Sequence, residues 1–414
     1  MTADASMPAG EIASSGVPAA SSLTPAARDV PTWIRCCVLA IALVAVVRRT
    51  PWIVSNPQFW AEDGPLFFLD AYQHPLRSIL QPYADAGYYL LAPRLIAAAA
   101  TAAPVKDQPG IYVWVAAAIV LAVCALALSS RINLGRGTRC VMALAVALAP
   151  GPHEVFSSLT NSQWMFALGL VLVAASSAAR AAGDRIRDVA IVLLAGLTGP
   201  FSLFFVPLFA LRALRERSRF SLLLFGLVTI SGGIQALHLP GSRIGGEAHW
   251  REMVGAFALH GSRLFTSLFG QPSSWVVALF VALATAGVYA ALVFIGLWRP
   301  APEGLTFTLA ALLVLAPSFW AFRGAPLAMA GTGRYLYVPA VTLTWAIAAL
   351  LPSRLSIAGL VLIATSAIPW FVRPWRLVDF HWKEASSCIG VTDPCVIPIN
   401  PSGWNIVVHP KPSR

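Results

Sequence analysis

Long apolar runs recur along the whole chain and are separated by short polar segments. Many of these runs approach the roughly 20 residues that a helix needs to cross the hydrocarbon core of a bilayer. Only helices and closed barrels satisfy their backbone hydrogen bonds in lipid. Barrel strands alternate, whereas the runs here are continuous, as in "VVALFVALATAGVYAALVFIGLW". The pattern predicts an all-α polytopic membrane protein. The runs cover residues 33–49, 88–103, 110–130, 139–150, 162–179, 188–199, 200–214, 219–238, 273–298, 304–322, 335–352 and 355–372.

Composition agrees with a membrane protein. Of the 414 residues, 57% are hydrophobic and 11% are charged, whereas a soluble protein carries about 25% charged residues. The net charge of +11 comes from arginines scattered between the apolar runs. That distribution is typical of membrane topology, so we expect a lipid bilayer and no nucleic acid as the surroundings of this chain. The Ala-rich, Arg-over-Lys composition indicates a bacterial source.

The ends of the chain differ from its middle. Residues 1–30 are small, polar and proline-containing. They lack the basic segment and apolar core of a signal peptide, and we expect a disordered cytoplasmic tail. A multi-spanning domain is expected over residues 31–372, followed by a short outer tail at 373–414.

Arginine positions predict the topology. Clusters lie at 131–139, 180–187 and 212–219, and single arginines follow at Arg299 and Arg354. The positive-inside rule places all of these in the cytoplasm. With the N-terminus inside, the rule is satisfied only if one early run does not cross the membrane.

The run at 88–103 is the one that we expect not to cross. It is short and rich in alanine, and Pro93 and Arg94 lie near its centre. An arginine in mid-bilayer costs several kcal/mol, so this run is expected to form an interfacial or re-entrant helix on the outer side. About 11 spans remain (range 10–12), with a cytoplasmic N-terminus and a periplasmic C-terminus. The runs that flank Gly199 and Pro200 are short and could instead form one kinked helix.

This topology places most carboxylates outside. Eleven of the 18 acidic residues lie in the predicted outer segments, and the predicted inner loops are short and basic. We therefore expect the protein to do its chemistry at the outer face of the cytoplasmic membrane. The outer segments are residues 50–109, 151–161, 239–272, 323–334 and 373–414.

Two cysteines lie in the predicted outer tail. Six residues separate Cys388 from Cys395, and they include Gly390 and the Asp393-Pro394 pair, which favour a turn. An oxidising periplasm would join the two cysteines in a disulfide; two free thiols are the alternative. The remaining cysteines lie in or beside apolar runs, where they are expected to pack as small residues.

The first candidate site is the acidic pair in "NPQFWAEDGPLFFLDAYQ". Glu62 and Asp63 stand side by side among aromatic residues, which prefer the membrane interface. A carboxylate close to low dielectric can have a raised pKa that suits a general base. A solvated turn at Asp-Gly-Pro is the alternative.

A second candidate site is "GPHEVFSSLTNSQW". His153 and Glu154 end one apolar run, and Asn161 and Trp164 open the next. Helix capping and an interfacial tryptophan are the plain explanation of the last two, but they explain His153 and Glu154 less well. All four are candidate substrate-binding or catalytic residues.

The third candidate site is the outer segment 239–272. It carries Arg243, His249, Arg251 and Arg263 on the face where the positive-inside rule reduces cations. Such cations suit the phosphate of a lipid head group. A hydrophilic loop with local ion pairs is the alternative.

The fourth candidate site is "FRGAPLAMAGTGRYLYVP". Arg334 and Tyr335 follow a glycine-rich turn at the outer end of an apolar run. Arg334 either points into a shared cavity, where it would bind a phosphate, or snorkels to the surface. The sequence contains no Walker loop, dinucleotide fingerprint, HExxH or zinc-type cysteine pair.

Several of these stretches together resemble the GT-C superfamily of polytopic glycosyltransferases, especially its small bacterial members. They are "FWAEDG", "YYLLAPRLIAAAA", "PHEVFSSLTNSQW", "LTGPFSLFFVPL" and "GRYLYVP", in this order over about residues 50–340. The resemblance implies a GT-C-like helical bundle that transfers a sugar from a polyprenyl-phosphate donor to a glycan or glycolipid acceptor. Many members carry a soluble domain after the last helix, and the short tail here departs from that pattern.

The resemblance also implies roles for the candidate residues. The acidic residue of the first outer loop, here Asp63 with Glu62 as neighbour or substitute, is the general base or, in some members, a ligand of a divalent cation such as Mg or Mn. Glu154 is the second acid. The cations for the donor phosphate come from Arg243, Arg251, Arg263 and Arg334.

Two other classes remain open from the sequence. A transporter or flippase would show inverted repeats and ionisable residues at mid-membrane, whereas the acids here lie in outer segments. An oligosaccharide polymerase or ligase would favour a large late outer loop rich in Arg and His, which 239–272 partly provides.

Overall fold

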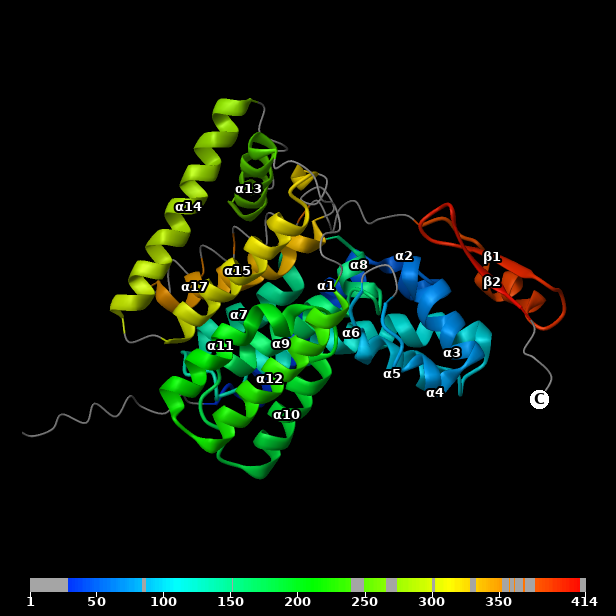
Figure 1. Cartoon of the computed structure of the whole chain (residues 1–414), viewed down its shortest axis with the longest axis horizontal. Coiled ribbons are helices and arrows are strands. Elements are labelled where there is room, and N and C mark those ends of the chain that lie inside the picture. Colours follow the sequence, from blue (N-terminus) through cyan, green and yellow to red (C-terminus); the bar gives the residue numbers. More distant parts are fainter. Residues whose placement is uncertain are drawn as a thin grey trace, which may run out of the picture.

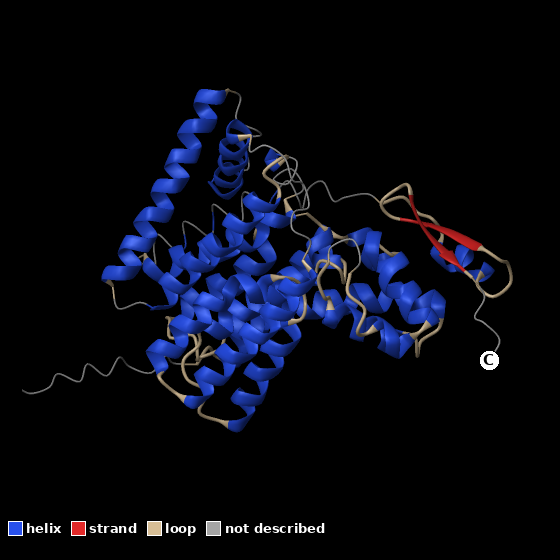
Figure 2. Cartoon of the chain, in the orientation of Figure 1, coloured by secondary structure: helices blue, strands red, loops and turns tan. Residues whose placement is uncertain are grey.

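The structure is a computed structural model in which the chain is mostly helical, with one β-hairpin near its C-terminal end (Figures 1 and 2). Most of the expected tail at 1–30 and of the expected last span at 355–372 lies outside the described residues. The structure describes residues 29–83, 87–150, 152–239, 249–265, 274–299, 302–327, 333–351, 357, 361, 368 and 377–409.

Four helices within these ranges are long and apolar enough to cross a membrane: Val105–Ala127, Arg219–His238, Trp275–Trp298 and Pro302–Ala321. They confirm the expectation of a helical membrane protein. The bundle consists of α1 (Thr32–Arg49), α6 (Gln108–Ala127), α7 (Arg136–Leu148), α9 (Ser162–Ala175), α10 (Ala182–Gly196), α11 (Phe201–Glu216), α12 (Arg219–His238), α14 (Trp275–Trp298), α15 (Pro302–Ala321) and α17 (Tyr337–Leu350).

Helix α17 lies at the centre of the bundle, between α15 and α7. The indole N–H of Trp345 donates to the carbonyl of Met142 at 2.9 Å, and the hydroxyl of Tyr337 donates to the carbonyl of Val146 at 2.6 Å. A buried tryptophan or tyrosine needs such a partner for its polar atom. The two bonds fix α17 against α7, and the start of α17 supplies one side of the candidate site described below.

The first predicted outer segment forms a chain of short helices, not a single long one. They are α2 (Pro51–Ser55), η1 (Ala61–Asp63), η2 (Gly64–Phe68), α3 (Leu69–Gln73), α4 (Pro75–Ser78), α5 (Leu91–Ala100) and η3 (Val105–Asp107). Arg94 of α5 is buried, pairs with Asp70 at 2.9 Å and lies over the ring of Phe67. At 1.5 Å per residue, α5 is about 15 Å long, half the thickness of the hydrocarbon core. Its length therefore supports the expected non-spanning helix.

The chain breaks between α10 and α11, where the sequence left one kinked helix open. Gly199 has a φ of +86°, a backbone conformation that glycine adopts without steric cost. Its N–H donates to the carbonyl of Tyr89, and Thr198 bridges to Leu90. The two runs are separate helices, and the turn between them lies against the first outer segment.

Residues 250–265 form a helix, α13 (Trp250–Phe265), within the segment that the sequence predicted as the outer loop 239–272. Trp250 lies against Trp275 at the start of α14, and His260 bonds to Tyr289 further along it. The two helices therefore run in the same direction. Small and apolar residues around Ala258 pack on α14. Their helical spacing was not evident from the sequence, because polar residues interrupt it.

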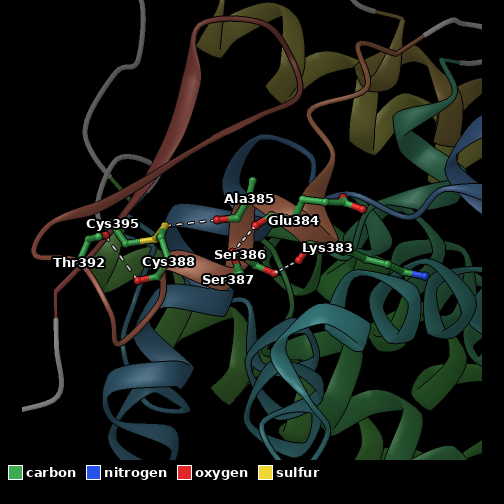
Figure 3. The surroundings of a disulfide bond; sticks show 8 residues. All are labelled: Lys383, Glu384, Ala385, Ser386, Ser387, Cys388, Thr392 and Cys395. Atoms are coloured by element: carbon green, nitrogen blue, oxygen red, sulfur yellow. Dashed lines mark hydrogen bonds between the residues drawn. A yellow bond between two sulfur atoms is a disulfide. The ribbon is translucent and has the colours of Figure 1, made fainter.

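The C-terminal tail folds against the first outer segment. Strands β1 (Cys395–Ile399) and β2 (Trp404–Val408) form an antiparallel hairpin, preceded by α19 (Trp382–Ala385) and η5 (Ser386–Cys388). Cys388 and Cys395 are joined by a disulfide (Figure 3). Strand β2 packs on η2, and the inward side chains of the hairpin share a second hydrophobic core with the first predicted outer segment (Figure 1).

Candidate functional site

Four of the five predicted outer segments meet at one cavity of about 270 Å³. Each contributes lining residues: Glu62 from the first, Asn161 from the second, Leu239 from the third and Arg334 from the fourth. Residues at the starts of α9 and α11 and at the end of α15 complete the walls. Segments hundreds of residues apart thus converge on one site.

Glu62 faces this cavity. It lies in the one-turn helix η1 and is partly exposed. The hydroxyl of Tyr83, another lining residue, donates to its Oε1 at 2.9 Å. Glu62 and Tyr83 therefore present a carboxylate and a phenol to the same cavity.

Asp63 has a different environment, although it is the next residue. It is 2% exposed and does not line the cavity. One carboxylate oxygen accepts the N–H of Leu159 at 3.0 Å, and the other accepts the N–H and the hydroxyl of Thr160 at 2.9 and 2.7 Å. Burial raises the pKa of Asp63 to about 7, against the opposing effect of these hydrogen bonds. Asp63 therefore ties η1 to the loop before α9.

Glu154, which does not line the cavity, forms an ion pair with Arg334, which does. Their charged atoms are 3.5 Å apart, and the indole N–H of Trp60 donates to Glu154 at 3.2 Å. Burial raises the pKa of Glu154, and Arg334 and Trp60 counteract that effect. Burial lowers the pKa of His153 to about 4, so its ring, packed against Trp60, is neutral at physiological pH.

Aromatic rings form one wall of the cavity. Trp164 makes edge contacts with Phe201 and Tyr335, and Phe322 packs on Tyr335. The indole N–H of Trp164 donates to Asn161 at 3.2 Å, which holds the ring in place. Aromatic faces combined with an amide, a carboxylate and a guanidinium can bind an amphipathic ligand with hydroxyl groups.

Of the cations predicted in segment 239–272, the two whose side chains the structure describes, His249 and Arg251, do not line this cavity. Arg251 is exposed and lies over the ring of Trp250. The side chain of His249 is exposed, and its backbone N–H donates to the carbonyl of Arg323 at 3.4 Å. Arg243 and the side chain of Arg263 lie outside the described residues.

The lining also includes residues that the sequence analysis did not assign to the site, among them Tyr83, Gln163 and Arg323. Gln163 stands in the quoted second motif and Arg323 in the fourth, so both motifs contained the signal. Tyr83 lies in "QPYADAGYY", an interfacial aromatic stretch whose role depends on its contact with Glu62.

The described residues do not fit the divalent cation that the sequence left open. Within those ranges there is no group of three or more His, Cys, Asp or Glu side chains arranged to hold a metal. Both oxygens of Asp63 accept hydrogen bonds from N–H or O–H donors, which a cation would displace.

Comparison of the chain with models of known protein families and with curated proteins gave no match. The arrangement of residues around the cavity therefore carries the functional argument.

Proposed function

We propose that this protein is a membrane glycosyltransferase of GT-C-like architecture. It moves a sugar from a polyprenyl-phosphate donor to a glycan or glycolipid acceptor at the outer face of the bacterial cytoplasmic membrane. One observation carries the proposal: a carboxylate, Glu62, and a guanidinium, Arg334, line the same aromatic-walled cavity where the predicted outer segments meet.

Contacts among the loops support about 11 spans with the N-terminus inside. The predicted inner loops contact one another, as in the pairing of Arg131 with Asp188 and of Arg215 with Thr306. The tail packs on the segment that follows α1, so the two share one side of the membrane. An even number of crossings then lies between them, and α1 makes the total odd.

Glu62 replaces Asp63 as the proposed general base. The sequence favoured Asp63, but its buried carboxylate is engaged with Leu159 and Thr160 and has no access to the cavity. Glu62 takes the proton of the acceptor hydroxyl as the hydroxyl oxygen attacks the anomeric carbon. A base on the acceptor side suits an inverting transfer.

Arg334 and Arg323 are the proposed partners of the phosphate. The bond between the anomeric carbon and the phosphate oxygen breaks, and its electron pair leaves with the phosphate. Guanidinium groups stabilise the charge that develops on that oxygen. Both arginines line the cavity, whereas Arg251 does not. Among the described residues, segment 239–272 therefore gives no support to the alternative of an oligosaccharide polymerase or ligase.

The test compares surface glycans and lipid-linked sugars of a deletion strain carrying wild type, Glu62→Gln or Asp107→Asn, matched for membrane expression. Asp107 is an exposed carboxylate of the same segment and serves as the control. We expect Glu62→Gln to lose about 10²–10⁴-fold in transfer rate and to accumulate polyprenyl-phosphate sugar, while Asp107→Asn restores the glycan. Full restoration of the glycan by Glu62→Gln would show that Glu62 is not the general base. An unchanged glycan profile in the deletion strain would favour a transporter or flippase.

A further inference from the structure

The C-terminal tail is attached to the backbone that carries Glu62. Ala61, immediately before Glu62, donates its N–H to the carbonyl of Asn400 at 2.5 Å, and Trp60 forms a bridge with the same residue. Ala61 has a φ of +42°, the left-handed region that alanine rarely adopts. Such a conformation persists only where surrounding contacts impose it.

The side chain of Asn400 fixes that carbonyl in place. Asn400 is 2% exposed. Its Nδ2 donates to the carbonyl of Val378 at 2.9 Å, and its Oδ1 accepts the N–H of Val378 at 3.2 Å. Asn400, in the turn between β1 and β2, therefore connects the start of the tail to the hairpin and, through its carbonyl, to Ala61.

Two further contacts flank this connection. Before Ala61, Gln58 donates to Asp379 at 3.1 Å and accepts the N–H of Phe380 at 2.9 Å. After it, Gly64 lies so close to the hairpin that an added Cβ would be 2.7 Å from a methyl of Ile406. The tail thus contacts the backbone on both sides of Glu62, and none of its described residues lines the cavity.

We propose that the tail, residues 377–409, is a positioning element for Glu62 and that Asn400 is its central positioning residue. The tail holds Ala61 in its strained conformation, and this conformation directs the Glu62 side chain into the cavity. When the contact is lost, Ala61 relaxes to a common backbone region and Glu62 leaves the cavity. The consequence for transfer chemistry rests on the proposed function, but the position of residue 62 can be measured without it.

The experiment uses the purified full-length protein in detergent. Cys36, Cys37, Cys124 and Cys140 are replaced by alanine, the native disulfide is kept, and Glu62→Cys reports on position 62. The rate of modification of this thiol by N-ethylmaleimide is compared with and without Asn400→Ala. We expect the rate to rise about tenfold, the factor by which loss of one buried hydrogen bond changes an opening equilibrium. The matched control is Asn405→Ala, an exposed asparagine of β2, which should leave the rate unchanged.

Two additional variants separate positioning from general loss of structure. Asn400→Asp keeps the acceptor for the N–H of Val378 but loses the donor to its carbonyl, so it should restore only part of the protection. Gln58→Ala weakens the same contact from the other segment and should raise the rate if Asn400→Ala does not fold. Equal rates in the Asn400→Ala, Gln58→Ala and Asn405→Ala backgrounds would overturn the proposal.

Activity gives an independent second readout with Glu62 restored. In the Asn400→Ala protein, kcat should fall while KM for the polyprenyl-phosphate sugar stays within about twofold, because the base moves and the phosphate partners do not. A changed thiol reactivity together with no transferase activity in the wild type would refute the proposed function and leave the positioning role intact. Unchanged thiol reactivity together with an active wild type would refute the positioning role and leave the proposed function intact.

Discussion

Asp63 and Thr160 are joined twice: the N–H and the hydroxyl of Thr160 both donate to the same carboxylate oxygen of Asp63, at 2.9 and 2.7 Å. The two residues are 97 positions apart in the sequence. This double contact fastens the first outer segment to the start of α9, and both elements contribute residues to the candidate site. Its role is therefore to build the cavity, and Glu62 is the carboxylate that faces it.

Asp63→Asn should destabilise the protein, because the new amide nitrogen cannot accept one of the hydrogen bonds from Leu159 or Thr160. An unmade buried hydrogen bond costs about 1–3 kcal/mol. The measurement is the thermal unfolding midpoint in detergent, with exposed Asp107→Asn as the control. Glu62→Gln should leave the midpoint close to that of the wild type. A midpoint for Asp63→Asn equal to that of Asp107→Asn would contradict the structural role.

The stability contribution of Asp63 should depend on pH. Burial raises the pKa of Asp63 in the folded chain to about 7, from an ordinary value of 3.8. Between these values the folded chain keeps a proton that the unfolded chain has lost. The free energy of unfolding therefore falls as pH rises from about 4 to about 7, by at most about 1.4 kcal/mol per pH unit, and levels off above. The difference in thermal midpoint between wild type and Asp63→Asn should shrink over this pH range. If the midpoints of the two proteins change with pH in parallel, Asp63 does not make this pH-dependent contribution.

Gly199→Ala should disturb the turn between α10 and α11. Its φ of +86° disfavours any side chain, and an added Cβ would lie 2.6 Å from Oε1 of Gln163, a cavity residue. We expect a loss of about 1–3 kcal/mol from backbone strain. Gly233→Ala on α12 is the control, because an added Cβ there meets nothing within 4 Å. The measurement is the thermal unfolding midpoint of each variant, and equal midpoints for Gly199→Ala and Gly233→Ala would contradict the prediction.

Arg334→Gln should weaken use of a phosphate-linked donor. The variant removes a guanidinium that lines the cavity and leaves Glu154 without its ionic partner. A charge-assisted hydrogen bond contributes about 1.5–3 kcal/mol, or roughly tenfold to more than a hundredfold in kcat/KM. Arg251→Gln, at an exposed position, is the matched control. The assay is transfer from a polyprenyl-phosphate sugar by membranes with equal protein content, and equal losses in both variants would count against the assignment.

Serine replacement of Cys388 and Cys395 should destabilise the tail by about 2–3 kcal/mol, the chain-entropy value for so short a loop. The disulfide also reports on topology, because it requires an oxidising compartment. Maleimide labelling of denatured cell extracts, with and without prior reduction, should show the two thiols blocked until reduced. Free thiols in freshly quenched cells would place the tail in the cytoplasm and reverse the expected orientation.

The sequence was sufficient for the class of protein and for the segments that build the cavity, because apolar length and arginine placement are local properties. The sequence did not show which of Glu62 and Asp63 faces the cavity. Adjacent residues of a single turn point in different directions, and the packing of Leu159 and Thr160 decides which of them is buried. Helix α13 was taken for loop because polar residues interrupt its small apolar face, which becomes evident only beside α14.

The contact between Gln58 and Phe380 spans 322 residues, and this separation affects biosynthesis. A ribosome adding about 5–20 residues per second needs roughly 15–65 seconds to make the chain between them. Throughout that interval the segment that carries Glu62 lacks its contacts with the tail. On the topology proposed above, this segment reaches the outer face before the tail is made, so a chain that stalls or is truncated before residue 377 would lack the element that we propose positions Glu62.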